Sequence, residues 1–170
     1  MLKFSGRDRV MDSDRIIVSK TDLTGKISYA SSYFLEISDY QFQDLIGKPH
    51  SVVRQPNVPR CIFKMLWELL KDGREAFAYL VNNTKNGDHY WVFAHVTPSR
   101  NEQGEITGYH SNRRKPQAKA LVEIAALYER LLAVEGNAAN RKVGLQQSYE
   151  MLVDILAKKG QDYDEYVLSL

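Results

Sequence analysis

The chain has 170 residues, of which 44% are hydrophobic and 26% charged. This composition is typical of a globular domain with a hydrophobic core, and the length suits one ordinary domain plus an additional segment. The formal net charge of +2 gives no nucleic-acid-binding signature, so we expect no nucleic-acid partner.

The single cysteine, Cys61, excludes an internal disulfide and a cysteine-based zinc site, and it favours a reducing compartment. No apolar run is long enough to span a bilayer. Residues 1–14 mix charges too densely for a signal peptide. We therefore expect a cytoplasmic protein with no direct membrane insertion.

The first part of the chain predicts two strands and a short helix. Residues 15–21 and 27–30 are rich in β-branched side chains, and a turn containing Gly25 separates them. A helix over residues 33–37 follows, with a serine before it as the cap. An irregular segment bounded by prolines then leads to an amphipathic helix over residues 62–70.

The strongest local signal is the hairpin around Asn86-Gly87, because both residue types tolerate a positive φ angle. Residues 77–81 and 90–96 flank it and are rich in aromatic and β-branched residues. A last strand is expected over residues 106–113. The order of elements and the absence of crossovers predict an α+β domain, with helices on one face of a five-stranded antiparallel sheet.

We expect three parts: an N-terminal segment (1–12), a central α+β domain (13–116) and a C-terminal helical region (117–170). In the last region, residues 119–135 and 140–159 show helical periodicity.

The predicted sheet carries four aromatic side chains on the face opposite its helices: Phe77, Tyr79, Trp91 and Phe93. An exposed face of this kind needs a cover. We expect the N-terminal segment, the C-terminal helices or a second copy of the chain to cover this face. We expect a homodimer through the outer sheet face or through the C-terminal helices, which are the expected output or assembly region.

The hairpin also places Asn82 on the same face as Leu80 and Ala78. A hydrogen-bonding amide among apolar neighbours indicates a pocket for a polar, planar ligand. Tyr90 belongs to the same inward-facing set. The basic run Arg113-Arg114-Lys115 is expected to be a solvated strand end.

Residues 13–115 resemble a PAS sensory domain and, within that family, the flavin-binding PAS domains of bacterial aerotaxis receptors. Two segments carry the resemblance: residues 47–59, Gly-Lys-Pro-His-Ser-Val-Val-Arg-Gln-Pro-Asn-Val-Pro, and residues 85–92, Lys-Asn-Gly-Asp-His-Tyr-Trp-Val. The resemblance implies FAD in a pocket between the sheet and its helices. It further implies a redox or oxygen sensor that passes the state of the flavin to a signalling partner, such as a protein of the chemotaxis system.

The resemblance also suggests roles for individual residues. Arg54 and Asn57 match a flavin-supporting motif, in which Asn57 replaces an aspartate and Gln55 replaces a histidine. Asn82 matches an asparagine that faces the isoalloxazine edge. Ala76 stands where the receptors have a tryptophan, which weakens the flavin assignment. The candidate cofactor-binding residues are Arg54, Asn57, Trp67, Asn82, His50 and Tyr90.

His50 occupies the position at which light-sensing flavin PAS domains carry their adduct-forming cysteine. An imidazole cannot form that thioether, so redox sensing is favoured over photochemistry. Trp67 lies on the apolar stripe of its helix, where it is either core or pocket wall.

Two other functions remain open. A haem-binding gas sensor needs a histidine in the pocket. His50 could reach it, whereas His89 is expected in solvent, His95 faces outward, and the orientation of His110 is unresolved. A cofactor-free interaction module, with its pocket filled by side chains, is the other alternative. No catalytic motif is recognisable, so we expect a binding and signalling module and not an enzyme.

Overall fold

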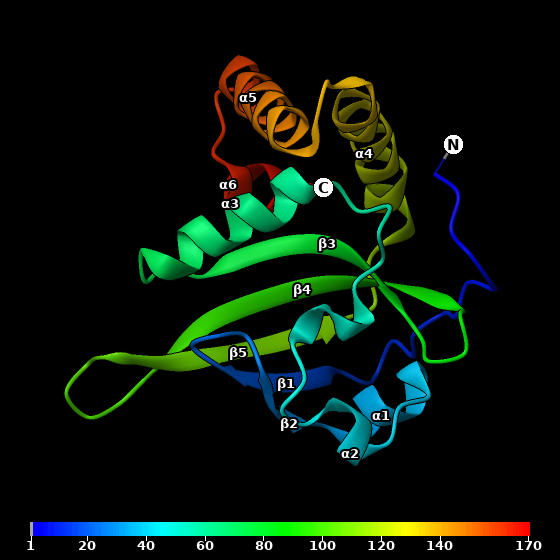
Figure 1. The fold of residues 1–170 in the computed structure, drawn as a ribbon, viewed down its shortest axis with the longest axis vertical. Helices are drawn as coiled ribbons and strands as arrows, with labels where there is room; N and C mark the ends of the chain where they lie inside the picture. Colours follow the sequence, from blue (N-terminus) through cyan, green and yellow to red (C-terminus); the bar gives the residue numbers. More distant parts are fainter. Residues whose placement is uncertain (1) are drawn as a thin grey trace.

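The computed structural model describes residues 2–170 and contains one antiparallel sheet with helices around it (Figure 1). Its elements in chain order are β1 (Ile17–Asp22), β2 (Ile27–Ala30), α1 (Ser32–Ser38), α2 (Phe42–Leu45), the 3-10 helix η1 (His50–Val53), α3 (Arg60–Lys71), β3 (Ala76–Asn83), β4 (His89–Arg100), β5 (Ile106–Arg114), α4 (Ala118–Asn137), α5 (Arg141–Lys159) and α6 (Tyr163–Leu168). The strand order is β2-β1-β5-β4-β3. The predicted fold class is therefore confirmed.

The helices are divided between the two ends of the sheet. Figure 1 shows α1 and α2 beside β1 and β2, whereas α4, α5 and α6 gather at the β3 end. Helix α3 lies over the inner face, and η1 lies beside the same face. No helix within residues 2–170 has the length and hydropathy needed to cross a membrane.

The β3–β4 hairpin has the predicted inward and outward faces. Its register pairs Asn82 with Tyr90 and Ala78 with Ala94. Residues 84–88 form the loop, and Gly87 has the positive φ of 90° that its turn requires. The Asn86-Gly87 turn, which its residue types predicted, therefore fixes which residues of β3 and β4 face inward.

Two elements extend beyond the predicted boundaries. Strand β4 continues to Arg100 because β5 pairs with it along this length, up to the pair of Arg100 with Ile106. The C-terminal tail, for which no element was predicted, forms α6. Asp162 and Glu165 supply a capping box at its start, which satisfies amides that a short helix leaves unpaired.

Both ends of the chain cover the outer sheet face. Phe4 packs edge-on against Trp91 with ring centroids 5.8 Å apart, and Tyr128 of α4 lies 6.3 Å from the same indole. Tyr79 is 5% exposed. The C-terminal helices thus fold back onto their own sheet, which is one of the two arrangements expected for them.

The N-terminal segment also explains an incorrect expectation about His89. The His89 amide donates to the Arg7 carbonyl, and the His89 carbonyl accepts from the Arg9 amide. The Nδ1 atom of His89 lies 2.8 Å from the Ser5 carbonyl oxygen. His89 is therefore buried instead of solvated.

Strand β3 lies at the edge of the sheet, and three of its outward backbone groups are bonded by partners from outside the sheet. The Phe77 amide donates to Asp164 Oδ1 (3.4 Å), and the Tyr128 hydroxyl donates to the Tyr79 carbonyl (2.5 Å). Further along, the Gln55 amide donates to the Val81 carbonyl (3.3 Å). These contacts protect an edge that could otherwise pair with another chain.

We predict that Tyr128→Phe lowers the free energy of unfolding by about 1–3 kcal/mol, because it leaves the buried Tyr79 carbonyl without its donor. Urea unfolding monitored by circular dichroism measures the change. Tyr29→Phe is the control, since Tyr29 is 44% exposed. Equal stability of the two variants would contradict the importance of this contact.

Candidate functional site

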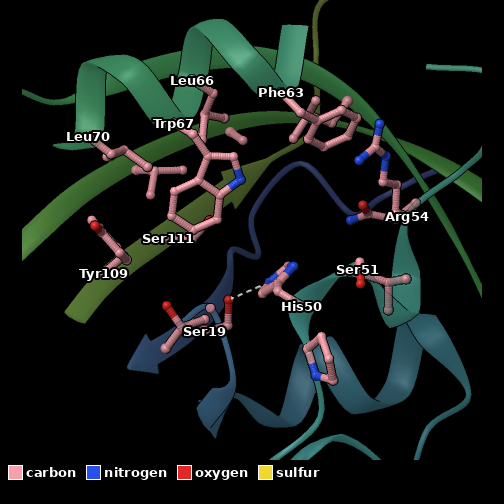
Figure 2. A pocket seen from close by; sticks show the side chains of 18 of the residues that line it. Ser19, His50, Ser51, Arg54, Phe63, Leu66, Trp67, Leu70, Tyr109 and Ser111 are labelled. Carbon is pink, nitrogen blue, oxygen red and sulfur yellow. Dashed lines mark hydrogen bonds between the residues drawn. The ribbon is translucent and has the colours of Figure 1, made fainter. Parts of the chain in front are cut away.

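A cavity of about 290 Å³, here called the inner pocket, lies between the inner face of the sheet and the segment from η1 to α3 (Figure 2). Its apolar walls come from α3 and from β3 and β4: Phe63, Leu66, Trp67, Leu70, Leu80 and Ala94. Its polar lining includes Ser19, His50, Arg54, Asn82, Ser111 and Arg113. Four of the six predicted site residues therefore line one cavity.

Trp67 forms part of the pocket wall. Figure 2 shows its indole pointing from α3 toward the sheet. The indole packs edge-on against the Tyr109 ring, with ring centroids 5.3 Å apart. A side chain at Gly25, in the β1–β2 turn, would lie 3.6 Å from the same indole. The wall is therefore closed on this side by an aromatic ring and a close backbone turn.

His50 lies on the opposite side of the inner pocket and is a neutral imidazole at neutral pH. Its Nε2 is 3.1 Å from Ser19 Oγ, and its ring stacks on Phe34 at 6.0 Å. Burial lowers the pKa of His50 to about 3, and the positive charge of Arg113 contributes to this shift. His50 adds hydrogen-bonding capacity here, but no charge.

Arg113 is the pocket residue that the sequence analysis missed. It is 2% exposed, and its Nη2 donates to Ser19 Oγ at 2.6 Å. Its Nε and Nη1 have no partner among residues 2–170, and its guanidinium lies 4.3 Å from the Phe34 ring centroid. Burial lowers the pKa of Arg113 to about 10, so the group remains charged at neutral pH.

The assignment of Arg113 to a solvated strand end was wrong because β5 gives no clear alternation of apolar and polar residues. The register settles its direction, since Arg113 pairs with Ala94, which also lines the inner pocket. Arg114, the next residue, is exposed as expected. Tyr109 and Ser111 line the same pocket, so the two-residue period of the strand carries Arg113 to their face once the structure has shown where they point.

Asn82 occupies the inner face as predicted. It is 5% exposed, and its Nδ2 makes no hydrogen bond of standard geometry among the described residues, although its amide lies beside the Tyr90 hydroxyl and partly offsets the burial that raises the pKa of that group. Buried polar groups are rarely left unpaired in native structures. Asn82 and Arg113 thus present unused donors to the same cavity.

Arg54 lies at the margin of the inner pocket. Its guanidinium is 3.6 Å from the Phe63 ring centroid, and its backbone forms a bridge with that of Asn82. Gln55 points away and donates to Asn83 Oδ1 at 2.8 Å, which fastens this loop to β3.

Two predicted site residues do not line the inner pocket. Asn57 is exposed, and its Nδ2 donates to the Lys3 carbonyl at 2.6 Å, because its side chain turns toward the N-terminal segment. Tyr90 does face inward, but it is buried with Phe34 and Leu45 in the apolar cluster next to the inner pocket and is not one of the lining residues. Burial raises the pKa of Tyr90 to about 12.

Cys61 does not line the inner pocket either. It is completely buried within the apolar cluster that α3 shares with the C-terminal helices. Burial raises the pKa of its thiol to about 11, so the thiolate is scarce at neutral pH.

The geometry restricts what the inner pocket can hold. Trp67 and the aliphatic side chains form an apolar slot, while Asn82 and Arg113 offer N–H groups that need acceptors. A flat heteroaromatic ring with acceptor atoms along one edge satisfies both requirements. A purely apolar ligand would leave these donors unpaired at a cost of about 1–3 kcal/mol each.

His50 predicts a pH dependence of stability. Its folded-state pKa is depressed to about 3. The unfolded chain therefore binds a proton below about pH 6.5, while the folded chain does not. Stability is lost as the pH falls, by about 2 kcal/mol between pH 7 and pH 5 from this group. His50→Gln should reduce that loss relative to the wild-type chain. Identical pH profiles in urea unfolding would contradict the assignment.

Comparison with known proteins agrees with this architecture. Residues 7–111 match the PAS fold family. The chain is 38% identical over 120 residues to the aerotaxis receptor of Escherichia coli (strain K12), which covers 71% of this chain and 24% of that protein. It is 26% identical over 105 residues to the nitrogen fixation regulatory protein of Klebsiella pneumoniae, covering 62% of this chain and 21% of that one.

A structure of a light-oxygen-voltage domain, from work with a flavin analogue, has a similar fold. Its TM-score is 0.57 at 19% identity, and the match covers 68% of this chain and 86% of that one. The present chain spans about a quarter or less of the length of the two curated relatives above. The match over residues 7–111, together with the sheet order and the pocket, shows that this chain belongs to the PAS family.

Proposed function

We propose that this chain is a flavin-binding PAS module that senses redox state or oxygen, binds FAD non-covalently, and passes the state of the flavin to a signalling partner. The observation that carries the proposal is the set of three unpaired nitrogen atoms on two residues that line the inner pocket, Nδ2 of Asn82 and Nε and Nη1 of Arg113. The isoalloxazine ring offers acceptors along one edge and a flat face for Trp67. The similarity to the aerotaxis receptor supports a flavin and a chemotaxis-type partner.

Arg113 gives the inner pocket its electrostatic character. It is charged and buried, and its guanidinium has no carboxylate within salt-bridge distance among residues 2–170. The neutral His50 does not change this balance. An occupant that gains negative charge on reduction is therefore stabilised by Arg113, because the low-polarity surroundings strengthen the attraction.

The route to the output passes through β3. Asn82 belongs to this strand, and the outward edge of the same strand is bonded by Tyr128 of α4 and Asp164 of α6. A change in the hydrogen bonds of Asn82 shifts the strand on which these helices dock. The C-terminal helices then present an altered surface to a cytoplasmic partner or to a second copy of the chain.

The visible spectrum of freshly purified protein tests the cofactor. A yellow protein that releases FAD on denaturation is expected. An intense Soret band would indicate the haem alternative, in which His50 is the pocket histidine. A colourless protein that takes up no flavin on titration would indicate an interaction module without a cofactor.

We predict that Asn82→Leu weakens FAD binding by about tenfold to a hundredfold, since it removes hydrogen bonds worth about 1–3 kcal/mol to buried ligand atoms. Fluorescence titration of FAD measures the dissociation constant. The matched control is Asn112→Leu in β5, where the side chain lies outside the inner pocket. An unchanged dissociation constant in Asn82→Leu would remove Asn82 from the site.

We also predict that reduction of the bound flavin changes hydrogen exchange in β3 and α4. The amides near Tyr79 and Tyr128 should exchange faster in one redox state, because their shared contact depends on the position of β3. Exchange mass spectrometry on the full chain, oxidised and chemically reduced, makes the comparison. Strand β2 at the opposite edge serves as the internal reference. Identical exchange throughout would contradict an output through these helices.

A further inference from the structure

A second cavity, here called the basic groove, adjoins the inner pocket. It measures about 610 Å³ and is lined by residues of the η1–α3 segment and the α4–α5 junction, including Arg54, Arg60, Glu135 and Arg141. Ser51 and Arg54 line both cavities. The two cavities are therefore neighbours on either side of these two residues.

The basic groove is lined by three arginines and one carboxylate, that of Glu135. The buried carboxylate of Glu135 is fully used: its Oε2 accepts from Arg60 Nε at 2.8 Å, and its Oε1 accepts from the amides of Arg60 and Cys61 and from Ser148 Oγ. Arg60 is thereby neutralised and held in place. One arginine of the three is committed to the protein itself.

The other two arginines remain available. Neither Arg54 nor Arg141 forms a salt bridge among residues 2–170, and Arg141 is exposed at the start of α5. Arg60 Nη1 donates to the Arg141 carbonyl at 2.6 Å, so the beginnings of α3 and α5 lie next to each other. Burial lowers the pKa of Arg54, and the positive charges of Arg141 and Arg60 lower it further, although Glu135 opposes them.

We propose that the basic groove binds the phosphate-bearing arm of the flavin, with Arg54 and Arg141 as its cationic partners. This inference rests on the proposed function, because it places the ring system of the same ligand in the inner pocket. That pocket, at about 290 Å³, is at the lower end of the range for ligand sites and accommodates the ring system but not a whole dinucleotide. The remainder of the ligand must lie outside it, and guanidinium groups are well suited to phosphate.

The proposal makes the C-terminal helical region part of the ligand site. Arg141 lies beyond residues 7–111, over which the chain matches the PAS family. A ligand held by both Arg54 and Arg141 would connect the sensor domain to α5 directly. Occupancy by a phosphorylated flavin would then favour the docked position of the helices, whereas riboflavin would not.

The test compares FAD, FMN and riboflavin binding to the full chain after removal of any bound flavin. Wild-type protein should bind FAD and FMN about tenfold or more tightly than riboflavin. Arg141→Ala should weaken FAD binding by about three- to tenfold and leave riboflavin unchanged. Lys142→Ala removes the same charge from the next residue of α5 and should change neither. Raising the salt concentration should reduce the preference for FAD, because exposed charges are screened.

Equal effects of Arg141→Ala on FAD and riboflavin, or no effect on either, would overturn the proposal. In both cases flavin binding itself would stand, so the proposed function would survive. Failure of wild-type protein to bind any of the three flavins would overturn both together. Arg141→Glu checks the same contact, since it should weaken FAD more than Arg141→Ala does and should still spare riboflavin.

Discussion

Strand β3 has to satisfy its outward backbone groups although it lies at the edge of the sheet. It does so with partners from outside the sheet: the Gln55 amide, the Tyr128 hydroxyl and the Asp164 carboxylate. This requirement connects three parts of the molecule. It seats the loop that carries Arg54, it draws α4 and α6 against the sheet, and it positions the strand from which Asn82 enters the inner pocket.

The second constraint is the buried charge of Arg113. Its guanidinium bonds Ser19 and lies over Phe34, but two of its nitrogen atoms are unused. A buried cation without a counter-charge is costly for folding and is usually retained for function. The neighbouring His50 is neutral because burial lowers its pKa, and the positive charge of Arg113 adds to this effect. The inner pocket therefore combines an apolar shape with a single positive charge, which is an unusual setting for core residues and a suitable one for a redox-active ligand.

Periodicity and turn chemistry were sufficient for much of this structure. The Asn86-Gly87 turn identified the hairpin, and the distance from that turn to Asn82 placed the amide on the inner face. The helical stripe of α3 placed Trp67 on the apolar side of its helix and left core and pocket wall open, and the structure shows it in the pocket lining. These predictions were accurate because local residue types determine them.

Other features depend on contacts between distant segments. Arg113 was missed because β5 lacks clear alternation, so that only its pairing with β4 shows which face it occupies. Asn57 was misplaced because the N-terminal segment, which lies 54 residues earlier at Lys3, binds its side chain. The basic groove joins the beginnings of α3 and α5, and neither sequence region alone indicates the other.

Cys61 has a consequence for how the molecule responds to oxidants. Its thiol is completely buried and its pKa is raised to about 11, so peroxides and disulfides meet almost no thiolate. Sulfenic acid formation and mixed disulfides are disfavoured at this position. Packing therefore protects the one cysteine of the chain from thiol oxidation.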